Sequence, residues 1–128
     1  MLKGKQSILV IEDQKSIRLL LNAILRKEFD VTTLSDGLAG MAWLNEGNIP
    51  DLILLDMQMP TVDGFQFLKV IKKSGIFSGI PVVVISGNES PLDKETCLSL
   101  GASYFLNKPF DPKELLNKIE GLLRPVAA

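Results

Sequence analysis

Five polar side chains stand at the ends of four short apolar runs in this sequence. In chain order they are Glu12, Asp13, Asp56, Ser86 and Lys108. Three carboxylates gathered in one pocket repel one another and raise each other's pKa values unless a cation offsets their charge. Mg²⁺ is a hard cation that suits one or two carboxylates plus several waters. The carboxylates therefore predict a magnesium site, provided that the fold brings them together.

A lysine and a hydroxyl on the other side of such a site favour a phosphoryl group as its ligand. Mg²⁺ neutralises the dianion, Lys108 adds a positive charge, and Ser86 donates a hydrogen bond. A carboxylate beside Mg²⁺ and a lysine can itself be the nucleophile, forming an aspartyl phosphate. This transfer depends on positioning and charge neutralisation more than on proton transfer, which suits a chain that has no histidine.

Short apolar runs alternate with helical patterns along the chain, and these elements must position the five residues. The runs predict buried strands at residues 7–11, 31–34, 52–55, 81–85 and 103–106. Apolar residues at helical spacing predict helices within residues 17–25, 40–44, 65–71, 92–100 and 115–123. Asp111-Pro112 is a helix start signal, and Gly101 is a stop signal.

Strand and helix alternate five times, which predicts an α/β fold. With right-handed crossovers, this order gives a doubly wound, open five-stranded parallel sheet with helices on both faces. Ligands bind such sheets at the carboxyl ends of the strands. We therefore expect the five polar residues to face one crevice.

Length and composition exclude several classes of protein. The 128 residues predict one domain, residues 1–128, and a formal net charge of −1 argues against direct binding of nucleic acid. The absence of histidine excludes Ser-His-Asp and Cys-His nucleophiles and the common zinc sites. The single cysteine, Cys97, cannot form an internal disulfide. No targeting signal or membrane-spanning stretch is visible, so we expect a cytoplasmic protein without a membrane partner.

The motifs resemble those of the receiver domains of bacterial two-component response regulators, of the chemotaxis-regulator type. The matching segments are residues 8–13 (ILVIED), 50–60 (PDLILLDMQMP), 63–64 (DG), 84–87 (VISG), 101–102 (GA) and 108–110 (KPF). The resemblance extends from Gln6 to about Leu123. It implies a flavodoxin-like sheet with strand order 2-1-3-4-5.

The resemblance also implies a role for each acidic residue of the site. Asp56 stands at the position of the phosphoacceptor. Asp13 and Asp56 stand where the family has direct Mg²⁺ ligands, together with the main-chain carbonyl of Gln58. Glu12 matches the acid that holds the metal through water.

Four further residues receive phosphoryl-binding or switch roles from the resemblance. Lys108 and Ser86 are expected to bind the phosphoryl group, and the bond between Lys108 and Pro109 is expected to be cis. Ser86 and Phe105 stand at the hydroxyl and aromatic switch positions. On phosphorylation, Ser86 is expected to move toward the site, and the ring of Phe105 is expected to turn from an exposed to a buried position. Phe105 lacks the hydroxyl of the tyrosine often found there, so its inward state rests on apolar burial.

The implied function is a phosphorylation-dependent signalling switch that catalyses only its own phosphorylation and dephosphorylation. Its phosphodonor would be a histidine kinase or a phosphotransfer protein, and its output would be a downstream protein target or a fused effector. The N-terminal methionine and the short tail at residues 124–128 favour a stand-alone regulator over an excised domain.

Three other functions compete with this interpretation. A flavin carrier needs a phosphate-binding loop after the first strand, where Glu12 and Asp13 would repel a phosphate. An aspartate-nucleophile phosphatase needs an acid two residues after the nucleophile, where Gln58 stands. A degenerate receiver that acts as a phosphorylation-independent interaction module stays open, although the site residues are intact.

Overall fold

The structure is a computed structural model that describes residues 4–59, 63–87 and 91–123. Pro60 of the sequence motif and the tail at residues 124–128 lie outside the described residues. Strands and helices alternate along the chain. The elements are β1 (Ser7–Ile11), α1 (Lys15–Leu25), β2 (Asp30–Leu34), α2 (Gly37–Asn45), β3 (Leu52–Asp56), α3 (Gly64–Lys73), β4 (Val82–Ser86), α4 (Pro91–Ser99), β5 (Tyr104–Asn107) and α5 (Pro112–Leu123).

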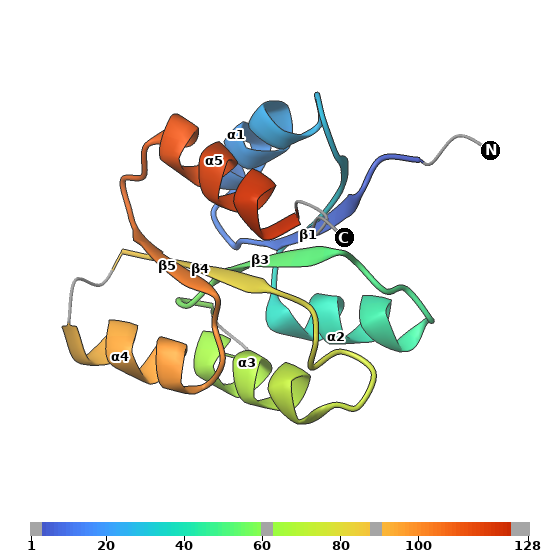
Figure 1. Ribbon diagram of the computed structural model, residues 1–128, viewed down its shortest axis with the longest axis vertical. Helices are drawn as coiled ribbons and strands as arrows, with labels where there is room; N and C mark the ends of the chain where they lie inside the picture. Colours follow the sequence, from blue (N-terminus) through green and yellow to red (C-terminus); the bar gives the residue numbers. More distant parts are fainter. Residues whose placement is uncertain (1–3, 60–62, 88–90, 124–128) are drawn as a thin grey trace, which may run out of the picture.

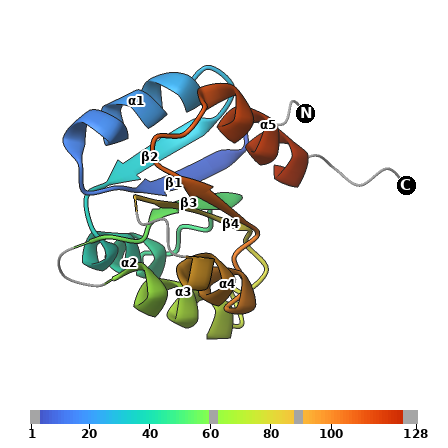
Figure 2. The ribbon, with the colours of Figure 1, turned by 90° about the vertical axis from the view of Figure 1, so that its left-hand side faces the viewer.

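The five strands form one parallel sheet in the order β2-β1-β3-β4-β5. Helices α1 and α5 cover one face of the sheet, and α2, α3 and α4 cover the other (Figures 1 and 2). This three-layer arrangement confirms the predicted doubly wound α/β fold and its strand order. No helix among the described residues is long and apolar enough to cross a membrane.

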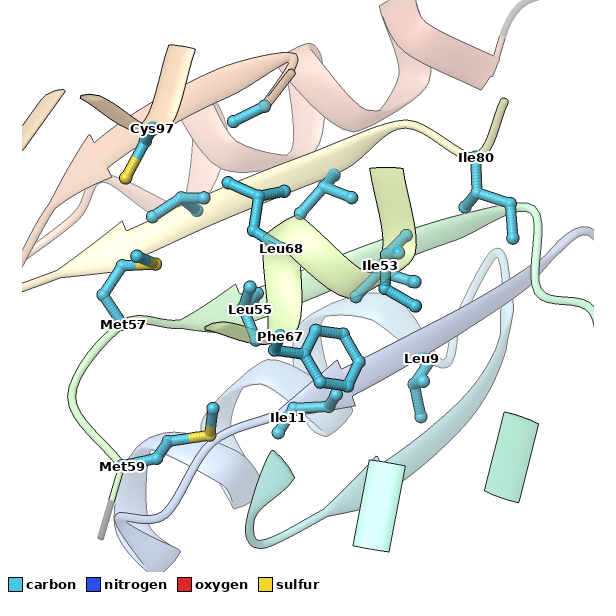
Figure 3. Close-up of a cluster of buried hydrophobic side chains, with 14 of the residues drawn as sticks. Leu9, Ile11, Ile53, Leu55, Met57, Met59, Phe67, Leu68, Ile80 and Cys97 are labelled. Carbon is cyan, nitrogen blue, oxygen red and sulfur yellow. The ribbon is translucent and has the colours of Figure 1, made fainter. Parts of the chain in front are cut away.

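The three central strands are buried because both faces of the sheet are covered. Every residue of β3 and β4 is buried, and β1 is buried from its second residue. Alternate side chains of each strand enter two separate clusters, one under α1 and α5 and the other under α2, α3 and α4. The second cluster is drawn in Figure 3, where the ring of Phe67 lies against Ile11 of β1. A Cβ on Gly40 of α2 would lie 2.6 Å from Ile11 Cδ1, so a larger residue at this position would require the Ile11 side chain to shift.

Local signals explain where α2, α3 and β4 begin. Asp36 and Asp63 accept hydrogen bonds from the main-chain amides of Ala39 and Gln66, and so cap α2 and α3. Helix α2 therefore starts three residues before its predicted position. Strand β4 begins one residue after its predicted start, because Pro81 precedes it.

The start and stop signals near the carboxyl terminus are confirmed. Helix α5 starts at Pro112, where the Asp111 carboxylate accepts a hydrogen bond from the Lys113 amide. Gly101 has a φ of 108° after α4, a conformation that glycine adopts without strain.

Candidate functional site

The parallel strands bring the polar residues predicted from sequence to one edge of the sheet. Glu12 and Asp13 directly follow β1, whereas Asp56 and Ser86 are the last residues of β3 and β4. Lys108 follows β5, and its main-chain N–H donates to the carbonyl oxygen of Ser86 over 2.8 Å. Since parallel strands end on the same side, their terminal residues meet there.

Three carboxylates form the centre of the site. Glu12, Asp13 and Asp56 each offer an oxygen, and the three oxygens lie within 4.8 Å of one another. Glu12 and Asp56 are buried, with exposed fractions of 1% and 2%, whereas Asp13 is exposed. The cluster therefore has two acids in the floor of the site and one acid at its opening.

Main-chain amides hold the two buried carboxylates in place. The amide of Gln14 donates to Glu12 Oε2 over 3.1 Å, and the amide of Gln58 donates to Asp56 Oδ1 over 3.1 Å. Each bond closes a turn two residues long, so the chain that follows the strand orients the acid that ends it. Asp56 Oδ2 is buried and has no hydrogen-bond partner among the described residues.

Lys108 supplies positive charge inside the site. Its ammonium nitrogen lies 3.1 Å from Glu12 Oε1 and 3.4 Å from Asp56 Oδ1, and its side chain is only 14% exposed. The peptide bond between Lys108 and Pro109 is cis, as the resemblance implies. One ammonium offsets only one of the three carboxylate charges.

The uncompensated charge perturbs the acids of the cluster. Burial, followed by the contacts with Asp13 and Glu12, raises the pKa of Asp56 to about 8, although the Gln58 amide opposes this shift. Burial also acts to raise the pKa of Asp13, but hydrogen bonding with Asp56 and Glu12 and the charge of Lys108 outweigh it, so that pKa is lowered. Without a metal, the cluster therefore keeps a proton on Asp56 near neutral pH.

The donor set fits a hard divalent cation. All three side chains offer carboxylate oxygens, which Mg²⁺ prefers. The buried Asp56 Oδ2 lacks a hydrogen-bond partner among the described residues, so its lone pairs could bind a cation. Asp13, at the exposed side of the cluster, leaves room for the waters that Mg²⁺ retains.

The two residues at the switch positions are both buried. Ser86 is 2% exposed, and Phe105 is 7% exposed and belongs to the cluster under α2, α3 and α4. The expectation that Phe105 starts from an exposed position is therefore wrong for this structure. A phenylalanine ring has no polar atom that favours contact with water, so burial in the adjacent cluster stabilises it.

Sequence reasoning missed the contacts that two residues make around the site. Arg18 of α1 donates from its guanidinium to the carbonyl oxygens of Glu12 and Asp13, over 2.9 Å and 3.3 Å. Gly64 is the first residue of α3, and it lies close to the loop that follows Asp56. An added Cβ there would lie 2.6 Å from Met57 Cα. The available sequence signals were an arginine one turn into the first helix and the Asp63-Gly64 pair. Neither signal predicts a contact with the site by itself.

Comparison with known proteins agrees with this geometry. The family model described as "Response regulator receiver domain" matches residues 8–120. Regulatory protein VanRc of Enterococcus gallinarum is 38% identical over 120 residues, which cover 93% of this chain and 50% of that protein. DNA-binding response regulator MtrA of Mycobacterium leprae is 34% identical over 121 residues, which cover 94% of this chain and 52% of that protein. The chain thus spans about half the length of these relatives.

A solved structure shows the same fold. The Mn(2+)-bound form of response regulator Rcp1 has a TM-score of 0.80 and 31% sequence identity, covering 95% of this chain and 97% of that chain. The family match, the relatives and the shared fold lead to one conclusion. This chain belongs to the response regulator receiver domains of two-component systems.

Proposed function

We propose that this chain is a phosphorylation-dependent switch whose phosphoacceptor is Asp56. The observation that carries the proposal is the Asp56 carboxylate, which is buried among Glu12, Asp13 and Lys108 and has one oxygen without a hydrogen-bond partner among the described residues. A buried carboxylate is costly unless it is paired with a cation, hydrogen-bonded or protonated, so a bound metal ion would stabilise the ionised form of Asp56. Receiver domains generally bind Mg²⁺ at an acidic pocket, and this cluster has the composition of one.

Asp13, Asp56 and the main-chain carbonyl of Gln58 would hold Mg²⁺ directly, and Glu12 would hold it through water. When bound, the ion neutralises the carboxylates and the incoming phosphoryl group. The Asp56 carboxylate attacks the phosphorus of a phosphohistidine on the donor protein. A P–O bond forms while the P–N bond breaks, and the electron pair of the broken bond stays on the imidazole. The ammonium of Lys108 then pairs with the transferred phosphoryl oxygens.

Ser86 is the proposed first link to the output surface. Its hydroxyl would bind a phosphoryl oxygen, which draws the end of β4 toward Asp56. Phe105 is already packed in the core. We therefore assign it a supporting role, in which its buried ring stabilises the arrangement of β4 and β5. Phosphorylation would thereby shift the populations of conformers that already exist, and so change the output surface.

The proposed donor is a histidine kinase or a phosphotransfer protein, and the proposed output is a downstream protein target or a fused effector. MtrA is named a DNA-binding protein, but the matched residues cover only 52% of it. The near-neutral charge of this chain leads us to expect no direct DNA contact from its own residues. We expect the domain to act in the cytoplasm, where its phosphodonor would meet it.

Intact-mass measurement after incubation with acetyl phosphate and Mg²⁺ tests the proposal. We expect the wild type to gain one acid-labile phosphoryl group and Asp56→Asn to gain none. Asp111→Asn is the matched control, because asparagine caps a helix as well as aspartate does. Equal labelling of the wild type and Asp56→Asn would refute the assignment, and no labelling of the wild type would favour a phosphorylation-independent interaction module.

A further inference from the structure

The loop between β1 and α1 carries two of the three acids of the site, and it is short. It consists of Glu12, Asp13 and Gln14. The N–H of Glu12 still donates to the carbonyl oxygen of Leu34 in β2, over 3.0 Å, so the sheet holds the start of this loop. Asp13 is the first residue beyond that support, and it is exposed. The direction of its carboxylate therefore depends on how the rest of the loop is held.

Helix α1 begins without the kind of side-chain cap that α2 and α3 have. Asp36 and Asp63 accept hydrogen bonds from main-chain amides in the first turns of those two helices. The side chain of Gln14, at the corresponding position of α1, makes no such bond among the described residues. A capping side chain ties the first turn of a helix to the chain that precedes it. Another contact must therefore fix the loop before α1.

The side chain of Arg18, one turn into α1, supplies this contact. Its Nη1 donates to the carbonyl oxygen of Glu12 over 2.9 Å and to that of Asp13 over 3.3 Å. A guanidinium is planar and presents its N–H groups in fixed directions, so it holds these two neighbouring peptide groups in one orientation. The Asp13 carboxylate is in turn hydrogen-bonded with Asp56 and Glu12. The main-chain oxygens of the loop thus contact Arg18, while the Asp13 carboxylate joins the cluster.

We propose that Arg18 is a positioning residue for the metal site, because it holds the loop so that the Asp13 carboxylate faces Asp56. This inference rests on the proposed function, since it concerns the divalent cation that the site would bind. Groups that orient metal ligands without touching the metal typically change metal affinity about 10- to 100-fold when they are replaced. Arg18 acts on the main chain and not on a carboxylate oxygen, so we expect the lower end of that range.

The charge of Arg18 and its hydrogen bonds have opposite effects on the affinity for a cation. A guanidinium near the site repels a divalent cation, so removal of the charge alone would strengthen binding. Loss of the two hydrogen bonds would weaken binding, because the loop could then turn the Asp13 carboxylate away from Asp56. The sign of the change in affinity therefore distinguishes a positioning role from a simple effect of charge.

Titration of the full chain with Mn²⁺ tests the proposal, because the electron paramagnetic resonance signal of the free ion is lost when it binds. Carboxylate and carbonyl oxygens suit Mn²⁺ as they suit Mg²⁺. Arg18→Gln removes the charge and shortens the side chain, and we expect it to raise the dissociation constant for Mn²⁺ about tenfold. Arg18→Lys keeps the charge and an N–H donor, so its affinity should lie between those of the wild type and Arg18→Gln.

Arg26→Gln is the matched control. Arg26 is exposed and follows the last residue of α1, about 12 Å farther along the helix axis than Arg18. The substitution therefore removes the same charge from the same helix at a distance from the loop. Exposed charges this far apart are largely screened at about 0.15 M salt, so we expect a dissociation constant within about twofold of the wild-type value. Circular dichroism at the temperature of the titration verifies that each variant is folded.

An Arg18→Gln variant that binds Mn²⁺ as tightly as the wild type, or more tightly, would overturn this proposal and leave the metal site itself intact. Equal weakening by Arg18→Gln and Arg26→Gln would also overturn it, because the contact with the loop would not be the cause. A wild type that binds no Mn²⁺ would refute the proposed metal site and this inference together. If Arg18→Gln does not fold, Arg18→Lys decides the question, since unchanged affinity in that variant would refute the positioning role.

Discussion

Replacing Asp56 with asparagine should change how the stability of the metal-free protein depends on pH. The folded protein holds the pKa of Asp56 at about 8, whereas an ordinary aspartate has a pKa of 3.8. Between these two values the folded state binds more protons at this site than the unfolded state does. The free energy of unfolding of the wild type therefore falls as pH rises through this window. Below the window the protonated Asp56 retains its full contribution, and above it the contribution is lost.

The size of the effect follows from the width of the shift. One pKa unit corresponds to about 1.4 kcal/mol. The interval from about pH 5 to about pH 7 lies inside the window, so Asp56 should remove about 2 to 3 kcal/mol of stability across it. The asparagine side chain of the Asp56→Asn variant is neutral, like the protonated carboxyl, and it does not titrate. The unfolding free energy of this variant should therefore fall less steeply with pH.

Urea denaturation with EDTA, measured for both proteins at several pH values, gives the difference between the two curves. Titrating groups distant from Asp56 contribute equally to both curves and cancel in the difference, whereas the neighbouring Asp13, whose pKa Asp56 helps to lower, does not cancel fully. We expect the wild type to lose stability relative to Asp56→Asn as pH rises, and the variant to be the more stable protein above about pH 8. Parallel curves between about pH 5 and about pH 7 would show that Asp56 does not hold a proton in the folded state.

Three other perturbations have defined outcomes. Mg²⁺ at ten times its dissociation constant should raise the free energy of unfolding by about 1.4 kcal/mol and so raise the melting temperature at matched ionic strength, and a melt unchanged by Mg²⁺ at neutral pH would contradict the proposed metal site. Gly64→Ala should cost about 1–3 kcal/mol in urea unfolding because its Cβ meets Met57; Gly75→Ala, with open space around it, should not, and equal effects would refute the packing argument. The buried Cys97, whose pKa burial raises to about 11, should react with a thiol reagent only as the chain unfolds, so fast labelling of the native protein at neutral pH would be inconsistent with this packing.

The sequence by itself determined the class of fold and the membership of the site. Apolar runs without polar alternation indicate strands covered on both faces, and their alternation with helices favours a parallel sheet between two layers of helices. Residues that follow such runs must lie at one edge of the sheet, so Glu12, Asp56 and Lys108 could be assigned to one site before their contacts were known. The strand order came from the family resemblance, because apolar patterning does not state which strands are neighbours.

Tertiary structure decided the environment of each residue. Glu12 and Asp13 are adjacent in the chain, yet one is buried beside Lys108 and the other is exposed, because successive residues leaving a strand point in different directions. The pKa of Asp56 depends on its own burial and on the carboxylates of Asp13 and Glu12, which follow a different strand. The inward position of Phe105 likewise depends on which elements pack beside it. The sequence pattern indicates which residues favour burial. The exposure of each side chain and its charged neighbours follow only from the packed arrangement of all the elements.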